Sequence, residues 1–159
     1  MATDVEKLAE RAVELAQQQP RAPIEPLVSD DGTPTPAGWR KIGELFRRQM
    51  PSKTFTAGRR GQFSYITARQ VAARLDEVVG PGNWRTAFIV IDREAHAVEC
   101  TLSVYNVPRS DVGYPNNPDA EPGDAQFEHE PLKAAYSDAF KRAAVQWGIG
   151  RFLYGEVQQ

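Results

Sequence analysis

The hydrophobic pattern of this chain changes its period at one turn, the Gly-Pro-Gly at residues 80–82. Before the turn, residues 67–79 repeat apolar side chains every three or four positions, which predicts an amphipathic helix capped by Thr67. After it, residues 97–105 alternate apolar and polar side chains, the period of a strand with one buried face. Residues 83–92 are apolar at odd and even positions alike, which predicts a strand covered on both faces. With a third strand expected at about residues 110–114, this part of the chain must form an antiparallel sheet.

A long helix is predicted at the end of the chain, over residues 131–147. It begins with a proline, which suits the first turn of a helix, and Gly148 is a natural stop. The expected buried stripe consists of Leu132, Tyr136, Phe140, Ala143 and Trp147. Lys141 and Arg142 fall outside this stripe, and the nearby Asp138 is a possible ion-pair partner for them.

The first third of the chain predicts two helices separated by a linker. A capping box starts an amphipathic helix over about residues 4–18, and five prolines mark residues 20–36 as extended. Residues 38–50 predict a second helix, which carries several basic residues. Phe63 and Tyr65 then alternate along a short β-like segment.

Together these elements predict an α+β fold, in which a curved antiparallel sheet of three or slightly more strands packs on the C-terminal helix. A chain of 159 residues suits one compact domain. We divide it into an N-terminal helix with a Pro-rich linker, residues 1–36, and a core domain, residues 37–159.

The charges are sorted along the chain, although the net charge is only −2. Between Arg40 and Arg74 there are nine basic residues and one acidic residue, Glu44, a net charge of +8. Residues 115–130 hold five acids and no Lys or Arg. Solvated helix faces explain either cluster alone, but a positive segment of this density on an acidic chain favours a polyanionic partner.

Several classes of protein are disfavoured. The longest apolar run, residues 87–91, is too short to cross a membrane, and the N-terminus lacks the apolar centre of a secretory signal. We therefore expect an intracellular, cytoplasmic protein without a membrane partner. Cys100 is the only cysteine, which excludes an internal disulfide. His96 and Cys100 are too few ligands for a zinc site.

No catalytic constellation is recognisable. The chain lacks an acid two positions before a lysine, as metal-dependent nucleases commonly have, and it lacks a phosphate-binding G-x-x-x-x-G-K-[S/T] loop. Asp92, Glu94 and Glu99 flank one predicted hairpin and leave a metal-dependent nuclease as an alternative, although solvated hairpin charges are the simpler interpretation. We expect a binding protein and not an enzyme, with no cofactor and no metal.

Binding of a nucleic acid is easier to build from these residues. Phosphates require Lys and Arg on one surface, and unpaired bases require aromatic faces or room to point outward. A Gly-flanked arginine pair precedes the aromatic segment, and further basic residues lie on the exposed part of the last helix. If the loop crosses that helix, a basic groove with an aromatic neighbour results. The candidate DNA-binding residues are Arg59, Arg60, Tyr65, Lys133, Lys141 and Arg142.

Three segments resemble the Rad fifty-two family of single-strand annealing proteins, and the prokaryotic and phage branch that includes DNA damage response protein A. These are TAGRRGQFSYITARQVAARLDEVVGPGNWRTAF, SDVGYP and KAAYSDAFKRAAVQWGIG, in the order and spacing of the family. The resemblance covers about residues 38–155. It implies the annealing-core fold, in which a Gly-rich basic loop precedes a strand, a helix and the sheet.

The resemblance also implies a function in recombinational DNA repair. Family members form homo-oligomeric rings that hold single-stranded DNA in a positive groove, with phosphates inward and bases open to a second strand, and they use neither nucleotide nor metal for annealing. Lys141 and Arg142 match the phosphate-gripping Lys-Arg pair, Tyr65 matches a tyrosine lining the groove, and Lys133 matches a basic residue of the same helix. We therefore expect strand annealing, or protection of DNA ends, at the nucleoid.

Two positions depart from the family pattern. Val145 stands where some relatives have an arginine, and Arg59 and Arg60 are shifted relative to the arginine of the Gly-rich loop. The departures imply lower affinity or a different path of the strand. A double-stranded RNA binding module remains the alternative, because it shares the order helix, three antiparallel strands, helix; its basic cluster belongs at the start of the last helix.

Overall fold

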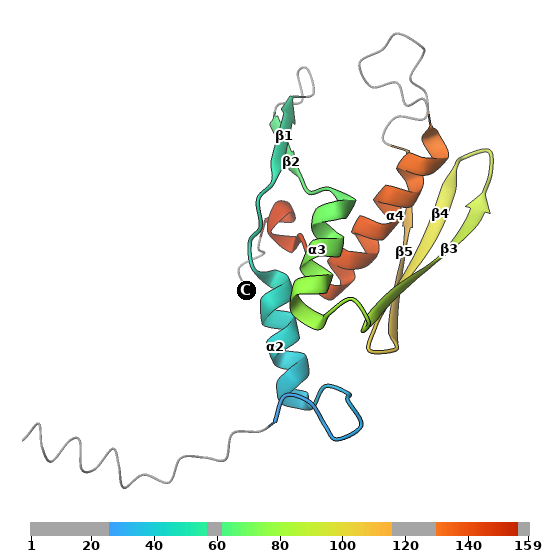
Figure 1. Cartoon of the computed structure of the whole chain (residues 1–159). Helices are drawn as coiled ribbons and strands as arrows, with labels where there is room; N and C mark the ends of the chain where they lie inside the picture. Colours follow the sequence, from blue (N-terminus) through green and yellow to red (C-terminus); the bar gives the residue numbers. More distant parts are fainter. Residues whose placement is uncertain (1–25, 57–61, 116–129, 156–159) are drawn as a thin grey trace, which may run out of the picture.

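A computed structural model of the chain describes residues 26–56, 62–115 and 130–155 (Figure 1). The helix expected over residues 4–18 lies outside the described residues. The helices are α2 (Pro36–Arg47), α3 (Ala68–Val79), α4 (Pro131–Trp147) and the short 3-10 helix η2 (Arg151–Tyr154). The strands are β1 (Lys53–Thr56), β2 (Gln62–Tyr65), β3 (Trp84–Asp92), β4 (Ala97–Val104) and β5 (Val107–Gly113). None of these helices has the length and apolarity that a bilayer crossing requires.

The second half of the chain forms the predicted antiparallel sheet, in the order β3-β4-β5. Trp84 pairs with Val104, and Val104 pairs in turn with Val107. Tyr105 and Asn106 link β4 to β5 with φ angles of 46° and 65°, as a two-residue hairpin turn requires. The strand β5 begins earlier than predicted and includes Pro108, which is tolerated because β5 is an edge strand. The α+β fold with its sheet on the final helix is confirmed.

Helix α4 lies across one face of this sheet, and its boundaries are those predicted (Figure 1). A Cβ built on Gly113 of β5 would lie 2.6 Å from the Cα of Ala139 and 2.7 Å from the carbonyl oxygen of Ala135. Ala135, Ala139 and Ala143 are fully buried along the helix. This row of small residues, at i, i+4 and i+8, lets the helix backbone approach the strand closely.

One part of the predicted stripe is wrong. Leu132 is 40% exposed, whereas Phe140 is buried and Tyr136 and Trp147 pack against the core. Leu132 shares the helical face of Ala139, but it lies in the first turn of α4, before the part of the helix that contacts Gly113. Phe140 is buried as predicted, and Trp84 of β3 stacks on it with 6.0 Å between ring centroids.

Helices α2 and α3 pack together, and α3 also contacts α4 (Figure 1). Thr67 caps α3 through a capping box with Gln70, as the pattern predicts. Arg74 of α3 joins the two helices, because its guanidinium donates to the carbonyl oxygens of Leu45 at 2.7 Å and Arg48 at 3.2 Å. Arg74 is therefore a structural member of the basic segment, and its side chain is only 11% exposed.

Strand β3 is covered on one face only within a single chain. Ile89 is 62% exposed and Ile91 is 50% exposed, while Phe88 and Val90 on the opposite face pack against the core. The prediction that β3 is covered on both faces is thus met on the α4 side alone. The strand β1 was not predicted, because its four residues carry no alternation long enough to recognise.

Replacing Gly113 with Ala should destabilise the protein by about 1–3 kcal/mol, because the new methyl group overlaps the backbone of α4. Urea denaturation measures the free energy of unfolding. Gly82→Ala is the matched control, since a Cβ there meets nothing within 4 Å. Equal stabilities of the two variants would contradict the close approach of β5 and α4.

Candidate nucleic-acid interface

A two-stranded hairpin, β1 with β2, projects from the body of the molecule (Figure 1). Lys53 pairs with Tyr65 at its base, and every side chain of β2 is exposed. Phe63 is 43% exposed and Tyr65 is 36% exposed. Arg59 and Arg60 of the connecting loop lie outside the described residues. The hairpin therefore presents two aromatic side chains outside the core, as the sequence suggested for this segment.

The base of the hairpin is anchored beside the end of α4. Ile66, next to Tyr65, is buried, and a Cβ on Gly150 would lie 2.7 Å from its Cδ1 atom. Gly150 has a φ of +81°, so glycine suits both the backbone conformation and the space. Tyr65 is thus tied to the turn that follows α4 and to the start of α3.

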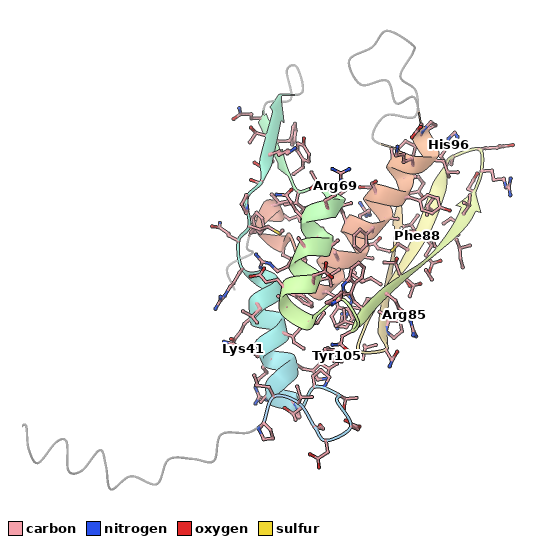
Figure 2. All side chains as sticks on the ribbon, viewed as in Figure 1. Lys41, Arg69, Arg85, Phe88, His96 and Tyr105 are labelled. Atoms are coloured by element: carbon pink, nitrogen blue, oxygen red, sulfur yellow. The ribbon has the colours of Figure 1, made fainter. Side chains whose placement is uncertain are left out.

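Arg69 lies in the first turn of α3, between the hairpin and α4 in the view of Figure 2, and it is exposed. Arg69 belongs to the basic segment between Arg40 and Arg74, but no motif in the sequence marks it as a DNA-binding candidate. Its position two residues after the helix cap Thr67 could have indicated a place beside the aromatic strand, because the helix follows directly on that strand.

Lys141 and Arg142 point in different directions from α4, because consecutive helical residues are separated by roughly 100°. The Nε atom of Arg142 lies 3.5 Å from Oδ1 of Asp111 on β5, and Gln146 donates to Oδ2 of Asp111 at 3.0 Å. Asp138, the possible partner from the sequence, instead accepts a hydrogen bond from the backbone N–H of Tyr114 at 3.2 Å. Within the described part of the chain, no ion pair forms at Lys141.

Asp111 holds Arg142 and Gln146 at the edge of the sheet. Burial raises the pKa of the Asp111 carboxyl. Hydrogen bonds from Gln146 and from the Val112 N–H, together with the charge of Arg142, lower the pKa by a larger amount. The net result is a pKa below the ordinary value of 3.8. Asp111 is therefore ionised at neutral pH, and it orients Arg142 along β5.

Lys133 lies in the first turn of α4 and is 79% exposed. Its Nζ atom is 2.8 Å from Oε2 of Glu130, at the position before the helix. The contact is a surface ion pair of small energetic value, so a polyanion competes with it easily.

One acid of the β3–β4 hairpin, Asp92, has a local structural role. Oδ1 of Asp92 accepts the backbone N–H groups of Glu94 at 2.8 Å and Ala95 at 3.0 Å, which closes the turn. Glu99 lies on β4, beyond this turn. The described residues contain no group of three side chains suited to hold a metal ion.

Comparison with known proteins identifies relatives. The model of a family described as Rad52/22 family double-strand break repair protein matches residues 40–159. Two proteins named single-stranded DNA-binding protein DdrA, from Deinococcus deserti and Deinococcus radiodurans, are 42% and 40% identical to the chain over 97 residues. The alignments cover 60% of this chain but only 43% and 42% of the two relatives, so the chain matches less than half of their length.

Replacing Asp111 with Asn should destabilise the protein by roughly 0.5–1 kcal/mol at pH 7, because Arg142 loses its charged partner at a partly exposed site. The folded-state pKa of Asp111 is lowered, so its contribution is complete above pH 3.8 and disappears as the pH falls through the folded-state pKa. Urea denaturation between pH 7 and pH 2.5 should show the two proteins converging at the acidic end. A difference in stability that does not change with pH would refute this role of Asp111.

Proposed function

Because this chain belongs to the Rad52/22 family of double-strand break repair proteins, we propose that it binds single-stranded DNA in a basic groove of an oligomeric ring. There it promotes annealing of complementary strands, or protects DNA ends, during recombinational repair. The names of the two DdrA relatives support the choice of single-stranded DNA as ligand. The function requires no catalytic step, nucleotide or metal, and its place of action is the nucleoid.

The observation that carries this proposal is the close packing of α4 on the sheet. The alanine row fixes the helix against Gly113, while Lys141 is half-buried and Arg142 is exposed on other faces of the helix. Cations held on a packed helix lose little conformational freedom when they bind phosphates, which favours binding. Arg142 is oriented further by its contact with Asp111.

The remaining proposed contacts come from the hairpin and from the first turn of α4. Arg59 and Arg60 would neutralise phosphates as the strand passes the hairpin, and Lys133 would do so after release from Glu130. Tyr65 supplies an aromatic side chain beside this path, and its exposure suits contact with a sugar or base. Arg69 is a further candidate, because it is exposed in the first turn of α3, directly after the hairpin (Figure 2).

The outer face of the sheet supports the proposed oligomer. Ile89 and Ile91 form an apolar strip on β3, and β3 and β5 are both edge strands. Exposed apolar strips and open sheet edges are features that a neighbouring subunit covers. A second copy of this chain packed there would complete the burial that the apolar pattern of β3 predicts. We assign this interface to the core domain, residues 37–159, with residues 1–36 as a separate N-terminal segment.

Removing both central cations of α4, by Lys141→Ala with Arg142→Ala, should reduce the slope of log K against log salt by about 1.4, at ~0.7 per single-strand phosphate contact. Fluorescence anisotropy of a labelled oligonucleotide at several salt concentrations measures this slope. The matched control is Lys41→Ala with Arg93→Ala, which removes the same charge from two exposed positions outside the site. An unchanged slope in the first variant would remove the pair from the site, and stronger competition by duplex RNA than by single-stranded DNA would refute the choice of ligand.

Replacing Ile89 with Glu should shift the protein toward smaller assemblies, because a carboxylate in the covered sheet face is costly to desolvate. The side chain is exposed in the single chain, so folding should persist. Size-exclusion chromatography with light scattering measures the mass. Leu132→Glu is the control, since Leu132 is also apolar and exposed but lies on α4. A wild-type protein that is monomeric at micromolar concentration would contradict the ring.

A further inference from the structure

Three arginines converge on a groove away from the hairpin. Arg47 of α2, Arg109 of β5 and Arg151 of η2 line a space of about 460 Å³ together with the rings of Trp39 and Trp147. No acidic residue lines this groove. Arg47 belongs to the basic segment of the sequence, whereas Arg109 and Arg151 lie outside it and in no motif that predicts a role for them.

Each arginine is held in place by neutral groups. Arg151 donates from Nε to the carbonyl oxygen of Val145 at 2.9 Å, and from a terminal nitrogen to that of Gln146 at 3.2 Å. The Cζ atom of Arg109 lies 4.8 Å from the ring centroid of Trp147. The stem of Arg47 packs against Gly148, where a Cβ would lie 2.9 Å from its Cγ atom.

These three guanidinium groups have no acidic partner among the residues that the structure describes. Like charges that share one groove repel each other, and the repulsion weakens when an anion enters between them. Guanidinium groups present planar pairs of N–H donors, the geometry that phosphate and carboxylate oxygens accept. The groove is therefore suited to an anion.

The tryptophan rings are already engaged, so they do not offer a platform for bases. Trp147 stacks on Trp39 at 5.9 Å between centroids, with 18° between the planes, and it also contacts Arg109. Its Nε1 atom donates to the carbonyl oxygen of Leu102 at 3.2 Å. Trp39 makes a further edge contact with Tyr105 at 6.0 Å. The stack fixes Arg109, and the groove recognises charge and not a nucleobase.

The groove continues from the proposed DNA site through one side chain. Gln146 lines the groove and donates to Asp111, the same carboxylate that orients Arg142. Arg142 precedes Gln146 by four residues, about 6 Å along the helix axis. A strand whose phosphate contacts Arg142 thus reaches the three arginines by following the β5 edge of α4.

We propose that this groove, named here the arginine groove (Arg47, Arg109 and Arg151), binds phosphates of the single strand and extends its path from α4 to α2. The inference rests on the proposed function, because it assumes that the anion is a DNA strand. Continuity with Arg142 favours a phosphate chain over the carboxylates of an acidic peptide. The bases of the strand remain free of stacking in this groove.

The test replaces Arg47 and Arg109 together by Gln, and separately by Lys. Arg151 is kept, because it caps the end of α4. The Gln variant should lower the slope of log K against log salt by about 1.4 for an oligonucleotide long enough to pass both sites. The Lys variant should keep most of the slope, because each lysine retains the charge. A structural role of the guanidinium groups would instead affect both variants equally.

Controls separate this inference from the proposed function. Arg93→Gln removes a positive charge from an exposed position in the turn after β3, outside the proposed sites, and should leave the slope unchanged. If the Lys141 and Arg142 variant lowers the slope but the Gln variant of the groove does not, the groove inference is wrong and the function stands. If the wild type binds no single-stranded DNA, both are wrong. If polyglutamate displaces the strand from wild type but not from the Gln variant, the groove serves a carboxylate partner and the inference is overturned.

Discussion

The close approach of β5 to α4 determines where everything else in this fold lies. Gly113 has no side chain at the point where the backbone of Ala139 crosses the strand. The alanines one turn before and after Ala139 keep the distance between the helix and strand backbones short. Because the helix sits this close, the wider rings of Phe140, Trp147 and Tyr136 pack toward β3, β4 and α2. The rotation of α4 then decides which of its charged residues face outward.

The fold places the basic residues in three kinds of environment. Arg74 donates hydrogen bonds to the carbonyl oxygens at the end of α2, and Arg151, which also lines the arginine groove, donates to carbonyl oxygens at the end of α4. Arg142 is exposed but oriented by a carboxylate, whereas Arg47 and Arg109 lie in the arginine groove with neutral neighbours. A count of basic residues therefore overestimates the charge available to a ligand, while the groove concentrates part of it at one place.

The elements with long, regular patterns were predictable from the sequence. The bounds of α4, the cap and end of α3 and the pairing of β3 with β4 follow from apolar periods, caps and glycines that act within a few residues. The strand β1 is too short for such a period, and the exposure of Leu132 depends on where along α4 the contact with the sheet begins, which the apolar period does not contain. The partner of Arg142 was missed for the same reason, since Asp111 lies on another element.

The sequence by itself determined the family, the α+β order of elements and the residue types available for binding a polyanion, because these depend on local patterns and on motif order. Only the tertiary structure decided which cations donate hydrogen bonds to helix-end carbonyl oxygens, that Asp111 orients Arg142, and which arginines converge in the arginine groove. The physical reason is that hydrogen-bond partners and charge neighbours are set by contacts between segments far apart in the chain. Those contacts arise from the packing of α4 on the sheet, whose effect on side-chain direction no local pattern contains.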